Sequence, residues 1–205
     1  MSTRATYQFR SEYGCDFTIY IHHDGYLKGA ATHFAAACRC PNQRGGMAER
    51  MLRAVDGAEL TESHEAHGDT EFRYTLARPR SGEAGPDVLL AEARSGESWR
   101  PVFQGTLAGF LNSYGEDGPK AWTMLGRRCL PVESLEALTK QAVEAARECL
   151  SKGWSGNADS YAGDVARYVK AGARMSREEL RGFLEEICVS FPHMVEYHLG
   201  EAGLS

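Results

Sequence analysis

The sequence lacks long apolar runs and has no regular cysteine pattern. No stretch approaches the roughly 18 consecutive apolar residues of a membrane-spanning helix, and the N-terminal residues contain no apolar signal-peptide core. The six cysteines follow no disulfide framework, and a chain of 205 residues can bury a core without such cross-links. We therefore expect a cytoplasmic protein with reduced thiols and no membrane partner.

Motifs of several enzyme and metal-binding classes are also missing. The sequence has no Gly-x-Ser-x-Gly nucleophile elbow, no Walker loop and no dinucleotide fingerprint. Cys38 and Cys40 are separated by one residue instead of the two typical of zinc knuckles. The segment from His64 to His67 has the wrong spacing for a zincin helix. These segments give no indication of a metal site, and no cofactor is expected.

The charge balance disfavours binding to bare nucleic acid. The formal net charge is -5, whereas nonspecific capture of a phosphate backbone depends on clustered Lys and Arg. Short groups of arginines such as Arg44, Arg50 and Arg53 are more typical of a solvated face. Long acidic runs, which a mimic of DNA would need, are absent as well. A protein partner therefore suits the composition better than a nucleic acid.

Hydrophobic periodicity predicts a sheet in the first part of the chain. Apolar and polar residues alternate over residues 4–10 and 16–22, which indicates a β-hairpin with one buried face. Further strands are predicted at 71–77, 88–94 and 99–104, and apolar residues at helical spacing predict helices at 27–38, 46–55 and 107–114. We expect an antiparallel sheet of about five strands with helices on one face, within residues 1–130.

The remainder of the chain is predicted to be helical. Apolar stripes at helical spacing recur between residues 135 and 149, 161 and 169, and 180 and 187, and a short helix is expected after Pro192. Ser176 and Glu179 form a capping box at the start of one helix. The fold class is thus α+β, with a helical region at 131–205 that either packs on the sheet domain or stands beside it.

The most informative segment is the strand-to-helix junction from Tyr20 to Tyr26. Strand alternation predicts that His22 and Asp24 project from the polar face of the hairpin. A carboxylate beside an imidazole can form a general acid/base pair, or the two can ligate a divalent metal, with His33 or His64 and His67 completing the ligand set. The alternative is structural, because Asp-Gly is a common turn and Asp can cap the following helix.

The N-terminal residues resemble a family of small phage and prophage proteins of largely unassigned function. The resemblance is carried by residues 2–5 and by residues 19–26, which match the family motif Ile-Tyr-x-His-Trp-Asp-Gly-Tyr at the end of a short hairpin. His23 stands where the family usually has Trp, so His22, Asp24 and Tyr26 are the matching side chains. The resemblance implies an accessory protein of a mobile element that acts on host machinery or defence.

Two functional hypotheses follow. The leading one is a phage or prophage accessory protein that binds and modulates a host protein complex, such as an immune effector in the manner of an anti-CRISPR protein. The rival is a small hydrolase or nucleotide-handling enzyme, with His22 as general base, Asp24 as its orienter and Arg4 as an anion clamp. The binding residues expected at the junction are Arg4, Tyr20, His22, Asp24 and Tyr26. The oligomeric state stays open.

Overall fold

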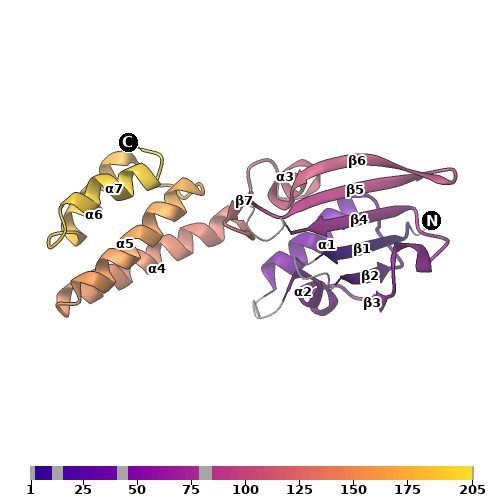
Figure 1. Cartoon of the computed structure of the whole chain (residues 1–205), viewed down its shortest axis with the longest axis horizontal. Coiled ribbons are helices and arrows are strands. Elements are labelled where there is room, and N and C mark those ends of the chain that lie inside the picture. The colour runs from indigo at the N-terminus through magenta and orange to yellow at the C-terminus, as the bar shows by residue number, and fades with distance from the viewer. Residues whose placement is uncertain (1–2, 11–15, 41–45, 79–84, 205) are drawn as a thin grey trace. The chain divides into compact units, whose positions relative to one another are not determined.

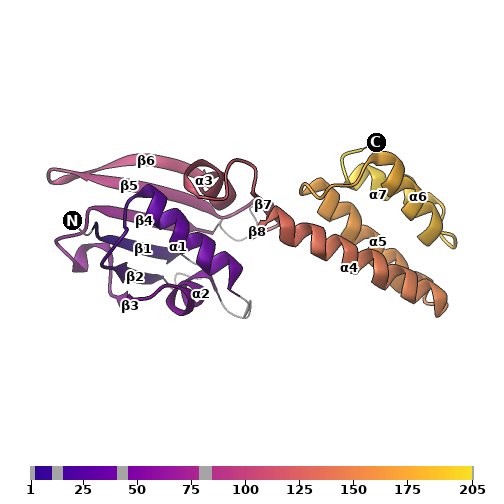
Figure 2. The same ribbon diagram turned by 180° about the vertical axis from the view of Figure 1, so that it is seen from behind.

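The computed structural model describes residues 3–10, 16–40, 46–78 and 85–204. The chain divides into two compact units, which we call the N-terminal unit (residues 1–130) and the C-terminal unit (residues 131–205). Each unit has its own buried cluster of apolar side chains. They are therefore described separately (Figures 1 and 2).

A six-stranded mixed sheet forms the centre of the N-terminal unit, with the strand order β3-β2-β1-β4-β5-β6. All neighbours are antiparallel except β1 and β4, which are parallel. The strands are β1 (Ala5–Arg10), β2 (Phe17–Ile21), β3 (Ala58–Thr61), β4 (Phe72–Ala77), β5 (Val88–Ser95) and β6 (Ser98–Thr106). The other elements are α1 (Leu27–Arg39), α2 (Met47–Ala54), the 3-10 helix η1 (His64–Ala66), α3 (Leu107–Tyr114) and the two-stranded sheet of β7 (Trp122–Leu125) and β8 (Arg128–Pro131).

The prediction of a purely antiparallel sheet of about five strands is wrong. The structure has six strands in a mixed sheet and a separate two-stranded sheet, and the described residues contain seven α-helices. Alternation of apolar and polar residues identifies a strand with one buried face. The pattern is the same whether the neighbouring strands run parallel or antiparallel. The missed strands β3, β7 and β8 have four residues each, which is too short for a clear alternating pattern.

The helices cover one face of the sheet, and this face holds the core (Figure 2). Alternate residues of β1 and β4 point toward α1, so that Tyr7 and Tyr74 stack with ring centroids 5.0 Å apart. Phe34 of α1 and Phe110 of α3 meet Tyr74 edge-on. These rings are almost fully buried, and burial of apolar area is the main stabilising contribution.

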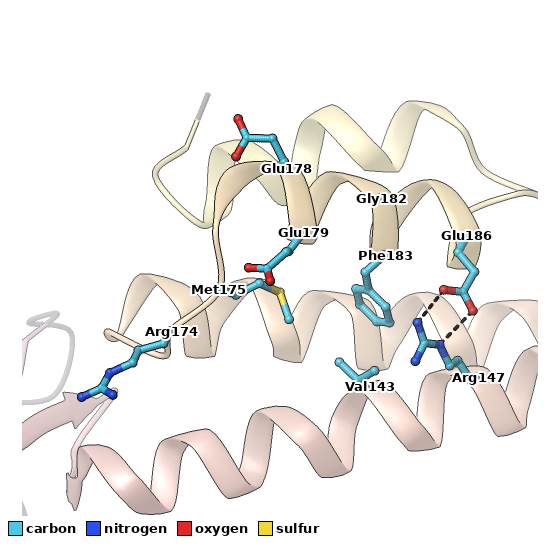
Figure 3. A pocket seen from close by; sticks show the side chains of 9 residues that line it. All are labelled: Val143, Arg147, Arg174, Met175, Glu178, Glu179, Gly182, Phe183 and Glu186. Atoms are coloured by element: carbon cyan, nitrogen blue, oxygen red, sulfur yellow. Dashed lines mark hydrogen bonds and ion pairs between the residues drawn. The ribbon is translucent and has the colours of Figure 1, made fainter.

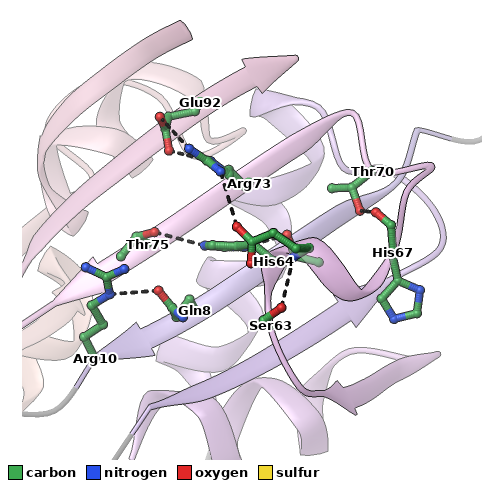
Figure 4. A network of polar contacts seen from close by, with 11 residues as sticks. Gln8, Arg10, Ser63, His64, His67, Thr70, Arg73, Thr75 and Glu92 are labelled. Atoms are coloured by element: carbon green, nitrogen blue, oxygen red, sulfur yellow. Dashed lines mark hydrogen bonds and ion pairs between the residues drawn. The ribbon is translucent and has the colours of Figure 1, made fainter. Parts of the chain in front are cut away.

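The opposite face of the sheet is polar, and we call it the open face. It carries the intervening residues of the central strands, such as Thr6, Gln8 and Arg73. The segment that connects β3 to β4 crosses this face, and η1 places the imidazole of His64 between β1 and β4 (Figure 4). The open face is therefore partly covered by a short polar connection rather than by a helix layer.

Four helices make up the C-terminal unit. They are α4 (Val132–Ser151), α5 (Ser155–Lys170), α6 (Arg177–Ile187) and α7 (His193–Glu201). Small residues such as Ala146 and Ala162 are fully buried and allow the helices to approach closely, while Leu180 and Leu184 of α6 fill the centre. The capping box is present at Ser176. Within the described part of the chain, no helix has the length and apolarity that crossing a bilayer demands.

Candidate functional site

The junction between β2 and α1 is a tight turn with a specific backbone. Asp24 has a φ of 52°, a left-handed conformation that Asp tolerates better than most residues. The amide of Gly25 donates to the Thr3 carbonyl at 2.8 Å, and the Tyr74 hydroxyl donates to the Gly25 carbonyl at 2.8 Å. A Cβ at Gly29 would lie 2.0 Å from the Asp24 carbonyl oxygen. A Cβ at Gly25 would lie 2.7 Å from the Ala5 Cβ, so backbone geometry and close packing account for the sequence Asp-Gly at this position.

His22 lies at the edge of the open face. Its Nε2 forms a hydrogen bond with Glu59 Oε1 of β3 at 2.8 Å, and the side chains are 59% and 54% exposed. Its ring also meets Tyr20 edge-on at a centroid distance of 4.5 Å. The carboxylate that bonds His22 therefore comes from the neighbouring strand. Because both side chains are well solvated, this pair contributes little to stability.

Arg4 and Tyr20 converge on Asp69, which follows η1. The Tyr20 hydroxyl donates to Asp69 Oδ1 at 3.2 Å, and Arg4 Nε lies 3.2 Å from Asp69 Oδ2. The ring of His67 stacks on Tyr20 at 3.7 Å, while its Nε2 bonds the Thr61 hydroxyl at 3.0 Å. Burial, followed by the Asp69 carboxylate, raises the pKa of Tyr20. The phenol is thus held protonated as a hydrogen-bond donor.

Asp24 and Tyr26 lie on the α1 side of the turn. Tyr26 is the N-cap residue of α1 and is 44% exposed. The Asp24 charge acts on Tyr7 and His33, which belong to the helix-covered face. His33 Nδ1 and the Tyr7 hydroxyl form a hydrogen bond at 2.9 Å. Burial and, to a smaller extent, the nearby His23 lower the pKa of His33 to about 4, while the Asp24 carboxylate partly opposes them.

His64 is the centre of a polar network on the open face (Figure 4). Its Nδ1 lies 2.7 Å from the Thr6 hydroxyl and its Nε2 lies 3.1 Å from the Thr75 hydroxyl. Burial, followed by the charge of Arg73, lowers the pKa of His64 to about 4. The imidazole is therefore neutral at physiological pH and joins β1 to β4. The histidines considered as metal partners of His22 are thus distributed over both faces of the sheet.

Arg73 extends this network toward β5. Its guanidinium binds the Glu92 carboxylate through two hydrogen bonds of 2.7 and 3.2 Å, and it lies 4.6 Å from the centroid of the Trp99 ring. Both charged side chains are largely buried, so their mutual contacts replace lost hydration. Sequence patterns do not identify this pair, because its members come from different strands whose register is set by the tertiary fold.

The chain matches no protein-family model, no curated protein and no solved structure at a significant level. The functional argument therefore depends on the geometry. General acid/base catalysis requires two groups that act on one reacting centre. Here His22 bonds Glu59 at the open face, whereas Asp24 belongs to the turn beside α1. The structure brings Arg4, Tyr20 and His22 to the same end of the open face, where His67 stacks on Tyr20, and Asp69 and Glu59 are the partners that the sequence did not indicate.

A groove of about 430 Å³ lies between α4 and α6 in the C-terminal unit (Figure 3). Val143, Met175 and Phe183 provide its apolar lining. At one end Arg147 binds Glu186 through two hydrogen bonds of 2.8 Å, which hold the two helices together. The groove therefore combines an apolar lining with a charged rim, a composition that suits a side chain of a protein partner.

Proposed function

We propose that the chain is an accessory protein of a phage or prophage that acts in the host cytoplasm. It binds a host protein complex, an immune effector in the manner of an anti-CRISPR protein, and modulates it. The observation that carries the proposal is the exposure of large apolar side chains in the C-terminal unit, and at the junction the His22 imidazole bonds Glu59 of β3. The phage origin is supported by the resemblance of residues 19–26 to the phage protein motif.

Exposed apolar side chains in the C-terminal unit support a protein partner. Val189 and Phe191 are 66% and 39% exposed and lie in the segment between α6 and α7, and Tyr197 of α7 is 56% exposed. Large apolar groups that stay in water in the isolated chain favour an interface, since a partner that covers them gains hydrophobic free energy. Aromatic residues are also enriched among the energetically dominant residues of interfaces.

The edge of the sheet offers a second contact. β3 is the terminal strand of the six-stranded sheet, so one side of its backbone has no neighbouring strand within this sheet. Leu60 in this strand is 63% exposed, and Phe17 of the adjacent β2 is 54% exposed. An extended segment of a partner can add to such an edge through main-chain hydrogen bonds, with specificity from the neighbouring side chains.

The enzyme hypothesis assigns a catalytic role to the junction. It requires His22 as base and Asp24 as its orienter, so loss of both ionisable groups should abolish the activity. The binding hypothesis predicts that this loss has little effect. Asp24→Asn is the suitable substitution because Asn tolerates the positive φ of this position, and His22→Gln keeps a polar side chain of similar length.

The test is a phage infection assay in a bacterial host with an active immune system, with the full chain expressed from a plasmid. We expect the double variant His22→Gln with Asp24→Asn to protect the phage as well as the parent protein does. The double variant Val189→Glu with Tyr197→Glu should reduce plaque formation by roughly tenfold or more. Circular dichroism spectra of both variants test whether they are folded. The opposite pattern, with loss of effect only at the junction, would favour the enzyme.

A further inference from the structure

Three side chains that commonly ligate metals meet inside the C-terminal unit. Asp159 lies on α5, Cys188 is the C-cap residue of α6, and His198 lies on α7. Cys188 and His198 are almost fully buried, and Asp159 is partly buried. One carboxylate oxygen, the sulfur and one imidazole nitrogen all lie within 4.8 Å of one another. Three helices therefore bring an oxygen, a sulfur and a nitrogen ligand to one point.

Two of the distances in this cluster are close to the edges of a tetrahedral zinc site. Asp159 Oδ1 lies 3.5 Å from Cys188 Sγ and 3.2 Å from His198 Nε2. With zinc bonds of ~2.3 Å to sulfur and ~2.0 Å to nitrogen and oxygen, the tetrahedral edges are ~3.5 Å for sulfur to oxygen and ~3.3 Å for nitrogen to oxygen. Two of the three edges thus have the required length before any rearrangement.

The surroundings of His198 provide a second, independent indication. Nδ1 of His198 is buried and has no hydrogen-bond partner among the described residues, while Glu201 Oε2 lies 3.6 Å from it. A metal-bound histidine commonly donates its second ring N–H to a carboxylate, which fixes the ring and raises its basicity. Glu201 stands in the place of that carboxylate. Gly163 leaves the necessary space, since a Cβ there would lie 3.1 Å from His198 Cε1.

Metal binding requires a change of protonation at two of the three ligands. Without an ion, the Cys188 thiol donates to Asp159 and the same carboxylate oxygen bonds His198 Nε2. On binding, the thiol loses its proton to solvent and forms the bond from sulfur to metal. The imidazole proton resides on Nδ1, so that the Nε2 lone pair faces the ion and Nδ1–H faces Glu201. The ion thus takes the position of the hydrogen atoms that join the three groups.

We propose that Asp159, Cys188 and His198 bind one zinc ion, with Glu201 as the outer partner of the imidazole and a water molecule in the fourth position. Thiolate and imidazole ligands select zinc over calcium and magnesium, which prefer oxygen. The ion joins α5, the end of α6 and α7, so it stabilises the packing of these helices. This inference is independent of the function proposed above.

The experiment uses the full chain, freed of metal by a chelator and kept reduced by a phosphine. Cobalt(II) replaces zinc as a spectroscopic probe, because a tetrahedral site with a thiolate ligand gives strong visible bands and a sulfur-to-metal charge-transfer band. We expect saturation at one equivalent, displacement of cobalt by zinc, and a zinc-dependent rise in the thermal midpoint of the C-terminal unit. Absence of the charge-transfer band at one equivalent would overturn the proposal.

Matched variants locate the site. Cys188→Ser and Asp159→Asn should weaken cobalt binding by at least roughly tenfold, and Cys188→Ser should remove the charge-transfer band. Cys149→Ser, which changes another cysteine packed against the same core, should leave spectrum and affinity unchanged. Glu201→Gln should keep the spectrum and lower the affinity by roughly tenfold. Circular dichroism of the metal-free variants controls for folding. A charge-transfer band that persists in Cys188→Ser or disappears in Cys149→Ser contradicts the assignment.

Discussion

Acidification should weaken the N-terminal unit in a pH range set by two buried histidines. The pKa values of His33 and His64 are each lowered to about 4 by burial, while in the unfolded chain both approach the ordinary value of 6.5. Below pH 6.5 the unfolded state therefore binds more protons than the folded state. The stability contribution is complete above pH 6.5 and is lost progressively as the pH falls toward 4.

The magnitude follows from this difference in proton binding. At pH 5 the unfolded chain carries almost one extra proton at each histidine, which lowers the free energy of unfolding by ~2 kcal/mol per histidine relative to neutral pH. Below pH 4 the loss reaches ~3 kcal/mol per histidine. His33 lies on the helix-covered face and His64 on the open face, so we expect their effects to add.

Urea unfolding at a series of pH values between 7.5 and 5 measures the effect. Replacement of the exposed Trp154 by Phe leaves Trp99 and Trp122, both in the N-terminal unit, as the fluorescent reporters. In this background His33→Gln and His64→Gln should each lower the free energy of unfolding at neutral pH. Each should also reduce the fall in the free energy of unfolding between pH 7.5 and 5 by ~2 kcal/mol.

The double variant with both substitutions provides the decisive comparison. Between pH 7.5 and 5 its free energy of unfolding should fall by ~4 kcal/mol less than that of the parent, although the double variant is less stable at neutral pH. If the parent and the double variant lost the same free energy over this range, the two imidazoles would not be the cause of the acid sensitivity, and the reasoning from their burial would be refuted.

Further predictions concern single packing and polar contacts. Gly29→Ala should destabilise the N-terminal unit by ~3 kcal/mol, since the added carbon would lie 2.0 Å from a backbone oxygen. Gly182→Ala on α6 should instead stabilise the C-terminal unit by ~0.5–1 kcal/mol, because the added carbon meets open space and Ala favours the helix. Arg73→Lys should cost ~1–2 kcal/mol in urea unfolding because Lys cannot replace both bonds to Glu92. Ser176→Ala removes the capping box and should cost ~1 kcal/mol in the C-terminal unit. Thermal denaturation followed by circular dichroism checks the glycine and serine variants. An unchanged thermal midpoint in Gly29→Ala would contradict the prediction for Gly29.

Local patterns in the sequence predicted many of the elements. The hairpin of β1 and β2 and the strand β4 have alternating apolar residues, β5 and β6 contain short apolar runs, and the helices have apolar stripes that the structure buries. These patterns arise because one face of each element meets a core. The pairing of β1 with β4 could not be predicted in the same way. It depends on a crossover through β2, α1, α2 and β3, and no residue in β1 or β4 encodes its direction.

The candidate site shows the same division between local and tertiary information. Alternation correctly placed Tyr20 and His22 on the polar face, where their rings meet. It does not extend to Asp24, because β2 ends at Ile21 and the backbone then turns. The partners Glu59 and Asp69 lie 37 and 49 residues away from the groups that they bind. Such contacts follow from strand register and from the path of a loop, which sequence periodicity does not determine.

The cluster of Asp159, Cys188 and His198 illustrates why a metal site can escape motif analysis. Zinc motifs are recognised when ligands lie two to four residues apart on one turn or helix, since the local backbone then sets their separation. Here Asp159 is 29 residues from Cys188 and 39 residues from His198, and each ligand belongs to a different helix or helix end. Their approach depends on the packing of α5, α6 and α7, which small buried residues such as Ala162 permit. The metal affinity of such a site depends on how closely the three helices pack. Substitutions that loosen this core without touching a ligand, for example Ala162→Gly, should therefore weaken zinc binding together with stability.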